Sequence, residues 1–284
     1  MTLRCVVQAS DRLGEGPVWS PLESRLYWFD IKGFRLSWYA PATDARGNFV
    51  LPIRASAAAP RARGGLIVAT EKGLANVDPD AGTIEMVVPM DLGEGFRSNE
   101  GKIDTLGRFW WSSMDDDGGK RPAAVFITTP NGVTRTALTG IHIPNTLSAS
   151  PDGSVIYVAD SARKTIYAHQ MADLKQVREF AHTRDEAASP DGSAVDIDGY
   201  LWNAQWGGSR IVRYAPDGSI DRIIQTPVSQ PTSCAFGGED LTTLYVTSAW
   251  DELSPGERAD EPLAGSLFAF EPGVKGLALP PYEG

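Results

Sequence analysis

A short strand-like segment recurs six times along the chain at nearly constant spacing. Each copy is rich in aromatic or β-branched residues; the six copies are RLYWFDI from Arg25, GLIVAT from Gly65, RFWWSSM from Arg108, SVIYVAD from Ser154, YLWNAQW from Tyr200 and TLYVTSAW from Thr243. Their central residues are Tyr27, Val68, Trp110, Tyr157, Trp202 and Tyr245, which lie 41, 42, 47, 45 and 43 residues apart. Such a period is typical of β-propeller blades with four strands each. The repeat therefore predicts an all-β fold, a six-bladed β-propeller.

The residues between these copies indicate how the blades are completed. Each copy leads into a second strand-like run that ends in Pro, Asn, Asp or Gly, which favour tight turns. Most copies continue into a third, outer run, such as GNFVLPI from Gly47. The last copy has no such run, whereas residues 2–9 (TLRCVVQA) have the pattern of a strand. We therefore expect the N-terminal strand to complete the final blade, and residues 1–284 to form a single propeller domain, since no linker divides them.

Charge and composition exclude several classes of protein. A net charge of −10 and a pI near 4.8 oppose the electrostatic attraction on which nucleic-acid binding depends. No apolar run approaches the ~18 residues of a membrane span, and the first residues lack the pattern of a secretory signal. The two cysteines, Cys5 and Cys234, offer neither a disulfide framework nor a CxxC zinc site. We expect a cytoplasmic protein, monomeric or weakly homo-oligomeric, that binds neither nucleic acid nor membranes.

Polar residues recur at one phase of the repeat. Counting back 11 or 12 residues from the central residue of four copies leads to Glu15, Asn99, Asn145 and Asp191. In a propeller this position starts the innermost strand, so these side chains can converge at the mouth of the central channel. Each motif alone would serve equally well as a turn, and only the shared phase favours a site. Such oxygen donors suit Ca²⁺, Mg²⁺, Mn²⁺ or Fe²⁺ better than a thiolate-seeking metal, with Zn²⁺ as a further candidate.

The motifs around these positions resemble those of a known family. GEGPVW, RSNEGKID, PNTLSASPDG and PDGSAVDIDGYLWNAQWGG follow one another as in the family of senescence marker protein 30 (regucalcin), gluconolactonase and related sugar lactonases. The resemblance covers essentially the whole chain. It implies that Glu15, Asn145 and Asp191 bind one divalent cation, and that Asn99 lies at or close to that cation.

The resemblance also implies substrate contacts. Arg97 matches a substrate-contacting arginine, and Asn99 is expected to contact either the metal or the substrate. Asp117 aligns with a substrate-contacting glutamate of some animal members. One departure is Glu100, where the family usually has Asp. The polar contacts favour a hydroxylated small molecule as the binding partner.

Metal-dependent hydrolysis of a sugar-derived lactone to its aldonic acid is the activity that the resemblance implies. Glucono-, xylono-, arabinono- and galactonolactone are the candidate substrates. A cation can polarise the lactone carbonyl and acidify water, and Asp191 is expected to act as both metal ligand and general base. Two alternatives stay open: a non-enzymatic cation-binding or regulatory propeller, and a related propeller esterase or phosphotriesterase.

Overall fold

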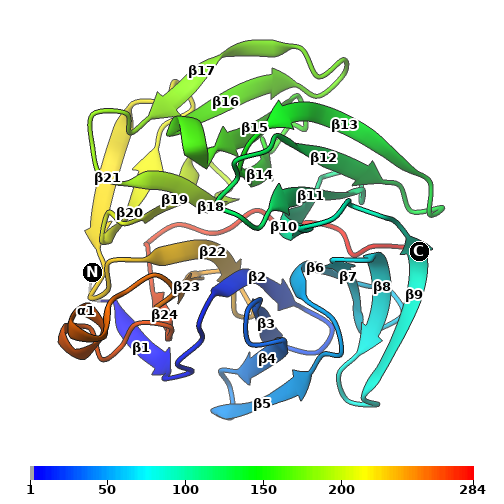
Figure 1. Ribbon diagram of the computed structural model, residues 1–284, viewed down its shortest axis with the longest axis horizontal. Coiled ribbons are helices and arrows are strands. Elements are labelled where there is room, and N and C mark those ends of the chain that lie inside the picture. The colour runs from blue at the N-terminus through cyan, green and yellow to red at the C-terminus, as the bar shows by residue number, and fades with distance from the viewer. Residues whose placement is uncertain (1–2) are drawn as a thin grey trace.

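The computed structural model describes residues 3–284, and these form six four-stranded antiparallel sheets arranged as blades around a central channel (Figure 1). The predicted six-bladed β-propeller is thereby confirmed. The first three blades, from the axis outward, contain β2 (Gly14–Ser20), β3 (Arg25–Asp30), β4 (Arg35–Ala40) and β5 (Ala45–Val50); β6 (Ala55–Pro60), β7 (Leu66–Thr70), β8 (Gly73–Asp78) and β9 (Thr83–Pro89); and β10 (Phe96–Ile103), β11 (Phe109–Asp115), β12 (Ala123–Thr128) and β13 (Thr134–Ile141).

The next two blades follow the same plan. They contain β14 (Pro144–Ala149), β15 (Val155–Asp160), β16 (Thr165–Gln170) and β17 (Gln176–His182), and β18 (Ser189–Val195), β19 (Leu201–Trp206), β20 (Arg210–Tyr214) and β21 (Ile220–Gln225). Two short helices lie outside the sheets, η1 (Ser161–Arg163) and α1 (Pro255–Asp260). Neither these nor any other helix within residues 3–284 has the length and apolarity that crossing a membrane requires.

The sixth blade combines the two ends of the chain. Its strand order is β1 (Arg4–Val7), β24 (Leu267–Phe270), β23 (Thr243–Ser248) and β22 (Pro231–Gly237), and β1 is antiparallel to β24. Of the segment expected to close the ring, Thr2 lies outside the described residues. The residues after β24 run back across the channel, as the red trace in Figure 1 shows.

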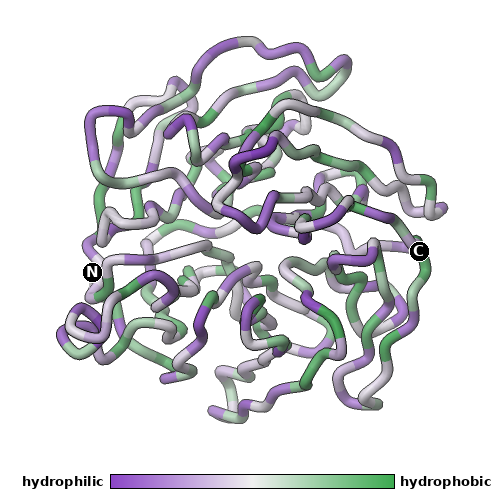
Figure 2. Tube along the Cα trace, in the orientation of Figure 1, coloured by the Kyte–Doolittle hydropathy of each residue, from purple (hydrophilic) through white to green (hydrophobic). Residues whose placement is uncertain are grey.

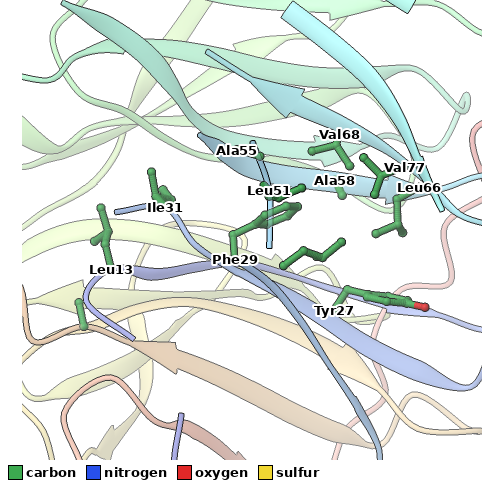
Figure 3. Packing of buried hydrophobic residues seen from close by; sticks show 12 residues of the cluster. Leu13, Tyr27, Phe29, Ile31, Leu51, Ala55, Ala58, Leu66, Val68 and Val77 are labelled. Carbon is green, nitrogen blue, oxygen red and sulfur yellow. The ribbon is translucent and has the colours of Figure 1, made fainter. Parts of the chain in front are cut away.

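Packing between neighbouring blades explains why the repeat is visible in the sequence. All six central residues of the repeat lie on the second strand of a blade and are buried. In the interface between the first two blades, Tyr27 and Phe29 of β3 pack against Ala58 of β6 and Val68 of β7 (Figure 3). Hydrophobic residues accordingly occur in every blade (Figure 2). Since each blade buries two faces, each copy needs the same apolar second strand.

Each inner strand has a register shift, or β-bulge, at the same level of the channel. The shifts lie between Glu15 and Val18, Ala55 and Ala57, Ser98 and Gly101, Asn145 and Ser148, Pro190 and Ser193, and Pro231 and Ser233. A bulge interrupts the alternation of side chains between the two faces of a strand and aims them in new directions. Adjacent residues of one inner strand can therefore both point into the channel at this level.

Buried aspartates hold tryptophan indoles in three of the blades. The Nε1 atoms of Trp28, Trp110 and Trp202 donate to Asp11, Asp104 and Asp196 at 2.7, 2.8 and 3.0 Å. Asp196 also accepts from Nε and Nη2 of Arg213, at 2.9 and 2.7 Å. Asp104 and Asp196 thereby join the turn before the second strand to the start of that strand, whereas Asp11 precedes the inner strand β2.

Replacing Asp196 is expected to destabilise the fold. Asp196→Ala should lower the free energy of unfolding by about 3 kcal/mol, because it leaves the buried indole of Trp202 and Nε of Arg213 without an acceptor. Urea denaturation measures the change. Asp198→Ala is the matched control, since that carboxylate is exposed and lies 4.0 Å from Arg213, and it should cost less than about 1 kcal/mol. Equal losses in the two variants would contradict the expectation.

Candidate active site

Four inner strands bring the predicted site residues to one level of the channel. Glu15 lies on β2, Asn99 on β10, Asn145 on β14 and Asp191 on β18, each at its strand's register shift. All four side chains are buried. The common phase in the sequence thus corresponds to a common height in the propeller.

A chain of hydrogen bonds fixes the two asparagines relative to Asp191's strand. Asn99 Nδ2 donates to Asn145 Oδ1 at 3.0 Å and to the carbonyl oxygen of Pro144 at 3.0 Å. Asn145 Nδ2 donates to Ser161 Oγ at 2.9 Å, and that hydroxyl donates to the carbonyl oxygen of Pro190 at 2.6 Å. The amide of Asn145 therefore has its nitrogen turned toward Ser161 and its oxygen toward Asn99.

The carboxyl groups of Glu15 and Asp191 are buried without a cationic partner. Neither group takes part in an ion pair within residues 3–284, and Glu15 Oε2 accepts from the backbone N–H of Gly16 at 3.0 Å. Burial, and then the charge of Glu100, raise the pKa of Glu15 to about 8. Burial, followed by the charges of Glu15 and Glu100, also raises the pKa of Asp191 well above its usual range. These carboxyl groups lie close enough to repel one another when ionised.

This set of donors fits a divalent cation. A cation would remove the repulsion between the two carboxylates, and carboxylate and amide oxygens are the ligands that hard cations prefer. Within residues 3–284, no three His, Cys, Asp or Glu side chains come together as a metal-binding group. A cation held by Glu15 and Asp191 would therefore depend on the amide oxygen of Asn145 as its third protein ligand.

Arg97 lies beside the site and is already engaged by protein groups. Its Nε donates to Asp116 Oδ1 at 2.7 Å, and its Nη1 donates to Asn99 Oδ1 at 2.7 Å. Its Nη2 reaches only the weak acceptor Met114 Sδ, at 3.2 Å. Arg97 therefore orients Asn99 and keeps one N–H-bearing nitrogen without a strong acceptor.

Asp117 is not brought to this group. Its side chain is 74% exposed and pairs with Lys120 at 2.8 Å. The neighbouring carboxylate, Asp116, instead lies between two arginines, 2.7 Å from Arg97 Nε and 2.6 Å from Arg54 Nη1. Nothing in the run of three aspartates distinguishes Asp116 from Asp117, because their roles are set by where β11 ends.

Glu100 is a further buried carboxyl group of the channel that the sequence interpretation did not include among the site residues. Its Oε1 accepts from the backbone N–H of Gly101 at 2.8 Å, whereas its Oε2 has no hydrogen-bond partner. In a regular strand it would point away from its neighbour Asn99. The register shift between Ser98 and Gly101 removes that constraint, and no pattern in the sequence shows a bulge.

The chain is similar along nearly its whole length to proteins named as sugar lactonases. A family model described as the SMP-30/Gluconolactonase/LRE-like region matches residues 13–250. A 6-deoxy-6-sulfogluconolactonase of Pseudomonas putida is 36% identical, with 100% of this chain and 99% of the relative covered. An L-arabinolactonase of Azospirillum brasilense is 37% identical, with 96% and 92% covered. Among solved structures, a calcium-binding protein, regucalcin, of Agrobacterium tumefaciens has a TM-score of 0.93 at 27% identity, covering 99% of this chain and 97% of that one.

Proposed function

Because this chain belongs to the SMP-30/gluconolactonase/LRE-like family, we propose that it is a sugar lactonase that uses one divalent cation to hydrolyse an aldonolactone to its aldonic acid. Relatives that are 36% and 37% identical and match nearly the full chain are named as lactonases, which supports an enzyme. The observation in this chain that carries the proposal is the buried pair Glu15 and Asp191 beside the amide of Asn145. Buried, unpaired carboxyl groups are costly to folding, and they occur where function requires them.

Glu15, Asn145 and Asp191 would hold the cation, with Asn99 adjacent to it. When bound, a divalent cation supplies Lewis acidity toward the lactone carbonyl and lowers the pKa of water. Oxygen donors favour Ca²⁺, Mg²⁺, Mn²⁺ or Fe²⁺ over Zn²⁺. The similar protein from Agrobacterium tumefaciens is described as calcium-binding.

The protein groups around this site would bind the substrate and move one proton. Asp191 would accept the proton of the attacking water, because a carboxylate at the cation site can also act as a base. Arg97 Nη2, whose one contact is the weak acceptor Met114 Sδ, is the donor beside the site that would bind a hydroxyl or ring oxygen of a sugar. Both hydrogens of Asn99 Nδ2 are already donated, to Pro144 and to Asn145. Held by their contacts to other protein groups, these side chains would orient the lactone for attack on its carbonyl.

Aldonolactones with five- or six-membered rings are the substrates that we propose. The two relatives act, by their names, on a gluconolactone derivative and an L-arabinolactone. These share a ring ester flanked by hydroxyl groups. A charged donor such as Arg97 Nη2 matches that chemistry better than it matches an apolar ester.

A substrate panel tests the proposal. Metal-stripped protein is reloaded with each divalent cation in turn, and acid release from glucono-, xylono-, arabinono- and galactonolactone is followed in weak buffer. The rate of spontaneous opening is subtracted. An aryl ester and a phosphotriester serve as the arms for the esterase alternative. Protein that binds a cation but accelerates none of the lactones above background would contradict the proposal and support a binding propeller.

Arg97 is expected to contribute to substrate binding through the geometry of its hydrogen bonds as well as through its charge. Arg97→Lys should raise KM by about 10-fold with a smaller change in kcat, because a lysine cannot bond Asp116 and Asn99 together. Steady-state kinetics on the best lactone of the panel measure the effect. Arg135→Lys, on the outer strand β13, is the matched control and should match the wild type. An unchanged KM in Arg97→Lys would show that Arg97 does not serve the substrate.

A further inference from the structure

A second layer of charged residues lies on β10 next to the predicted metal ligands. Glu100 is buried, with 2% of its surface exposed, and its Oε2 accepts no hydrogen bond. Lys102 lies two residues further along the same strand. Its Nζ donates one long hydrogen bond, 3.4 Å, to the carbonyl oxygen of Cys234. Neither side chain forms an ion pair within residues 3–284, so both charges are left to act over longer distances.

The free oxygen of Glu100 is directed at the strand that carries Asp191. A Cβ atom on Gly192 would lie 2.8 Å from Glu100 Oε2 and 2.0 Å from Ser233 Oγ. Position 192 therefore requires glycine, because any side chain there would displace the carboxylate. Ser233 Oγ is also buried without a hydrogen-bond partner. The backbone N–H of Gly101 bonds Glu100 Oε1, but no donor among the described residues bonds Oε2 on the side of Gly192.

Lys102 lies near the free oxygen of Glu100. Its Nζ bonds the carbonyl oxygen of Cys234 at 3.4 Å, and the preceding residue, Ser233, has its Oγ beside Gly192 together with Glu100 Oε2. Arg97, the other cation near this level, is already paired with Asp116. Lys102 is thus the one ammonium group near these carboxyl groups that has no carboxylate of its own among the described residues.

When all three carboxyl groups are ionised, a divalent cation balances the charges of these two layers. Glu15, Glu100 and Asp191 supply three negative charges, and Lys102 supplies one positive charge. Two further positive charges complete the balance in a buried channel, where an uncompensated charge is costly. Glu100 attracts a cation at the neighbouring ligands, whereas Lys102 repels it.

We propose that Glu100 strengthens, and Lys102 weakens, the binding of the divalent cation at Glu15, Asn145 and Asp191, each acting through its charge as a positioning residue. The proposal rests on the proposed function, because it requires the cation site there. The proposal predicts that removing the charge of Glu100 lowers the affinity for the cation, whereas removing the charge of Lys102, on the same strand, raises it. A loss of packing or of local structure would weaken binding in both cases.

Calorimetric titration of the chelator-treated, full-length protein with Ca²⁺ and with Mn²⁺ tests the proposal. Glu100→Gln keeps the size and the Oε1 acceptor, and it should weaken binding by about 10- to 100-fold, the range found when groups next to metal ligands are changed. Lys102→Met keeps most of the length and should tighten binding by about 10-fold. Glu85→Gln on the exposed strand β9 and Lys175→Met are the matched controls, and each should stay within two-fold of the wild type.

Glu15→Gln separates failure of this proposal from failure of the proposed function. If the wild type binds neither ion, or Glu15→Gln binds it as tightly as the wild type, the metal site itself is misplaced. If Glu15→Gln loses the ion but Glu100→Gln and Lys102→Met both equal the wild type, the charge layer alone is refuted. Weaker binding in both variants would also overturn it. Should Glu100→Gln fail to fold, Lys102→Met still decides the matter by the sign of its effect.

Discussion

Asp191→Asn is expected to lower kcat for the preferred lactone by about 1,000-fold or more. The change keeps the shape of the side chain but removes both a charged metal ligand and the proposed general base, whose removal alone costs about 100- to 10,000-fold. Initial rates are measured with the cation in large excess, so that weaker metal binding does not set the result, and the spontaneous rate is subtracted. A variant that retains more than about a tenth of the wild-type kcat would exclude Asp191 as the base.

The sequence itself offers a matched control for this experiment. The tripeptide Pro-Asp-Gly occurs three times, with its aspartate at Asp152, Asp191 and Asp217. Asp152 and Asp217 lie in exposed turns, where their carboxylates accept from the backbone N–H of Ser154 and Ser219. Asp152→Asn and Asp217→Asn should therefore leave kcat within two-fold of the wild type. Local sequence is identical at the three sites, so only the position in the propeller can separate them.

The period of the repeat predicts the fold because burial imposes it. Each second strand is covered on both faces by neighbouring blades, so an aromatic or β-branched segment recurs wherever such a strand occurs. The phase of Glu15, Asn145 and Asp191 is visible for a related reason. In the sequence, each of these residues is separated from the central residue of the second strand by one inner strand and its hairpin. That separation varies by only one residue among these blades.

Other parts of the molecule leave no such trace in the sequence. The inner strand β6 is ASAAAP, and alanines carry no strand pattern although all six of its residues are buried. Ser56 on that strand donates to Ser98 Oγ at 2.8 Å, a contact that depends on the close approach of two blades. Glu100 faces the channel because of a bulge, and Asp116 rather than Asp117 meets Arg97 because of where a strand ends. These features are decided by tertiary geometry, not by local preference.

Glu15→Gln is expected to reduce the affinity for the divalent cation by about 1,000-fold or more. An amide retains the oxygen but not the charge that holds a hard cation in a buried site. Calorimetric titration of the chelated protein measures the loss. Glu23→Gln, on the hairpin that follows β2, is the matched control and should bind the cation as the wild type does. Retention of full metal content by Glu15→Gln would exclude this residue as a ligand.

The same substitution should have the opposite effect on the stability of the metal-free protein. In the absence of metal, burial and the charge of Glu100 raise the pKa of Glu15 from 4.5 to about 8. Because the folded-state pKa is the higher one, the contribution of protonated Glu15 to stability is complete below pH 4.5 and is lost as the pH rises toward 8. Glutamine does not titrate, so the variant escapes this loss.

Chelated Glu15→Gln should therefore exceed the chelated wild type in unfolding free energy by roughly 2 kcal/mol at the upper end of that range, with the difference shrinking toward its lower end. Urea denaturation at both ends of the range, in chelator and in excess cation, measures the four values needed for each of the two proteins. Excess cation should reverse the order, because it stabilises only the protein that binds it. If Glu15→Gln were less stable than the wild type in chelator, Glu15 would support the fold directly. A reversed order of unfolding free energies in excess cation, by contrast, requires that the Glu15 carboxylate destabilise the metal-free fold and stabilise the fold once the cation is bound.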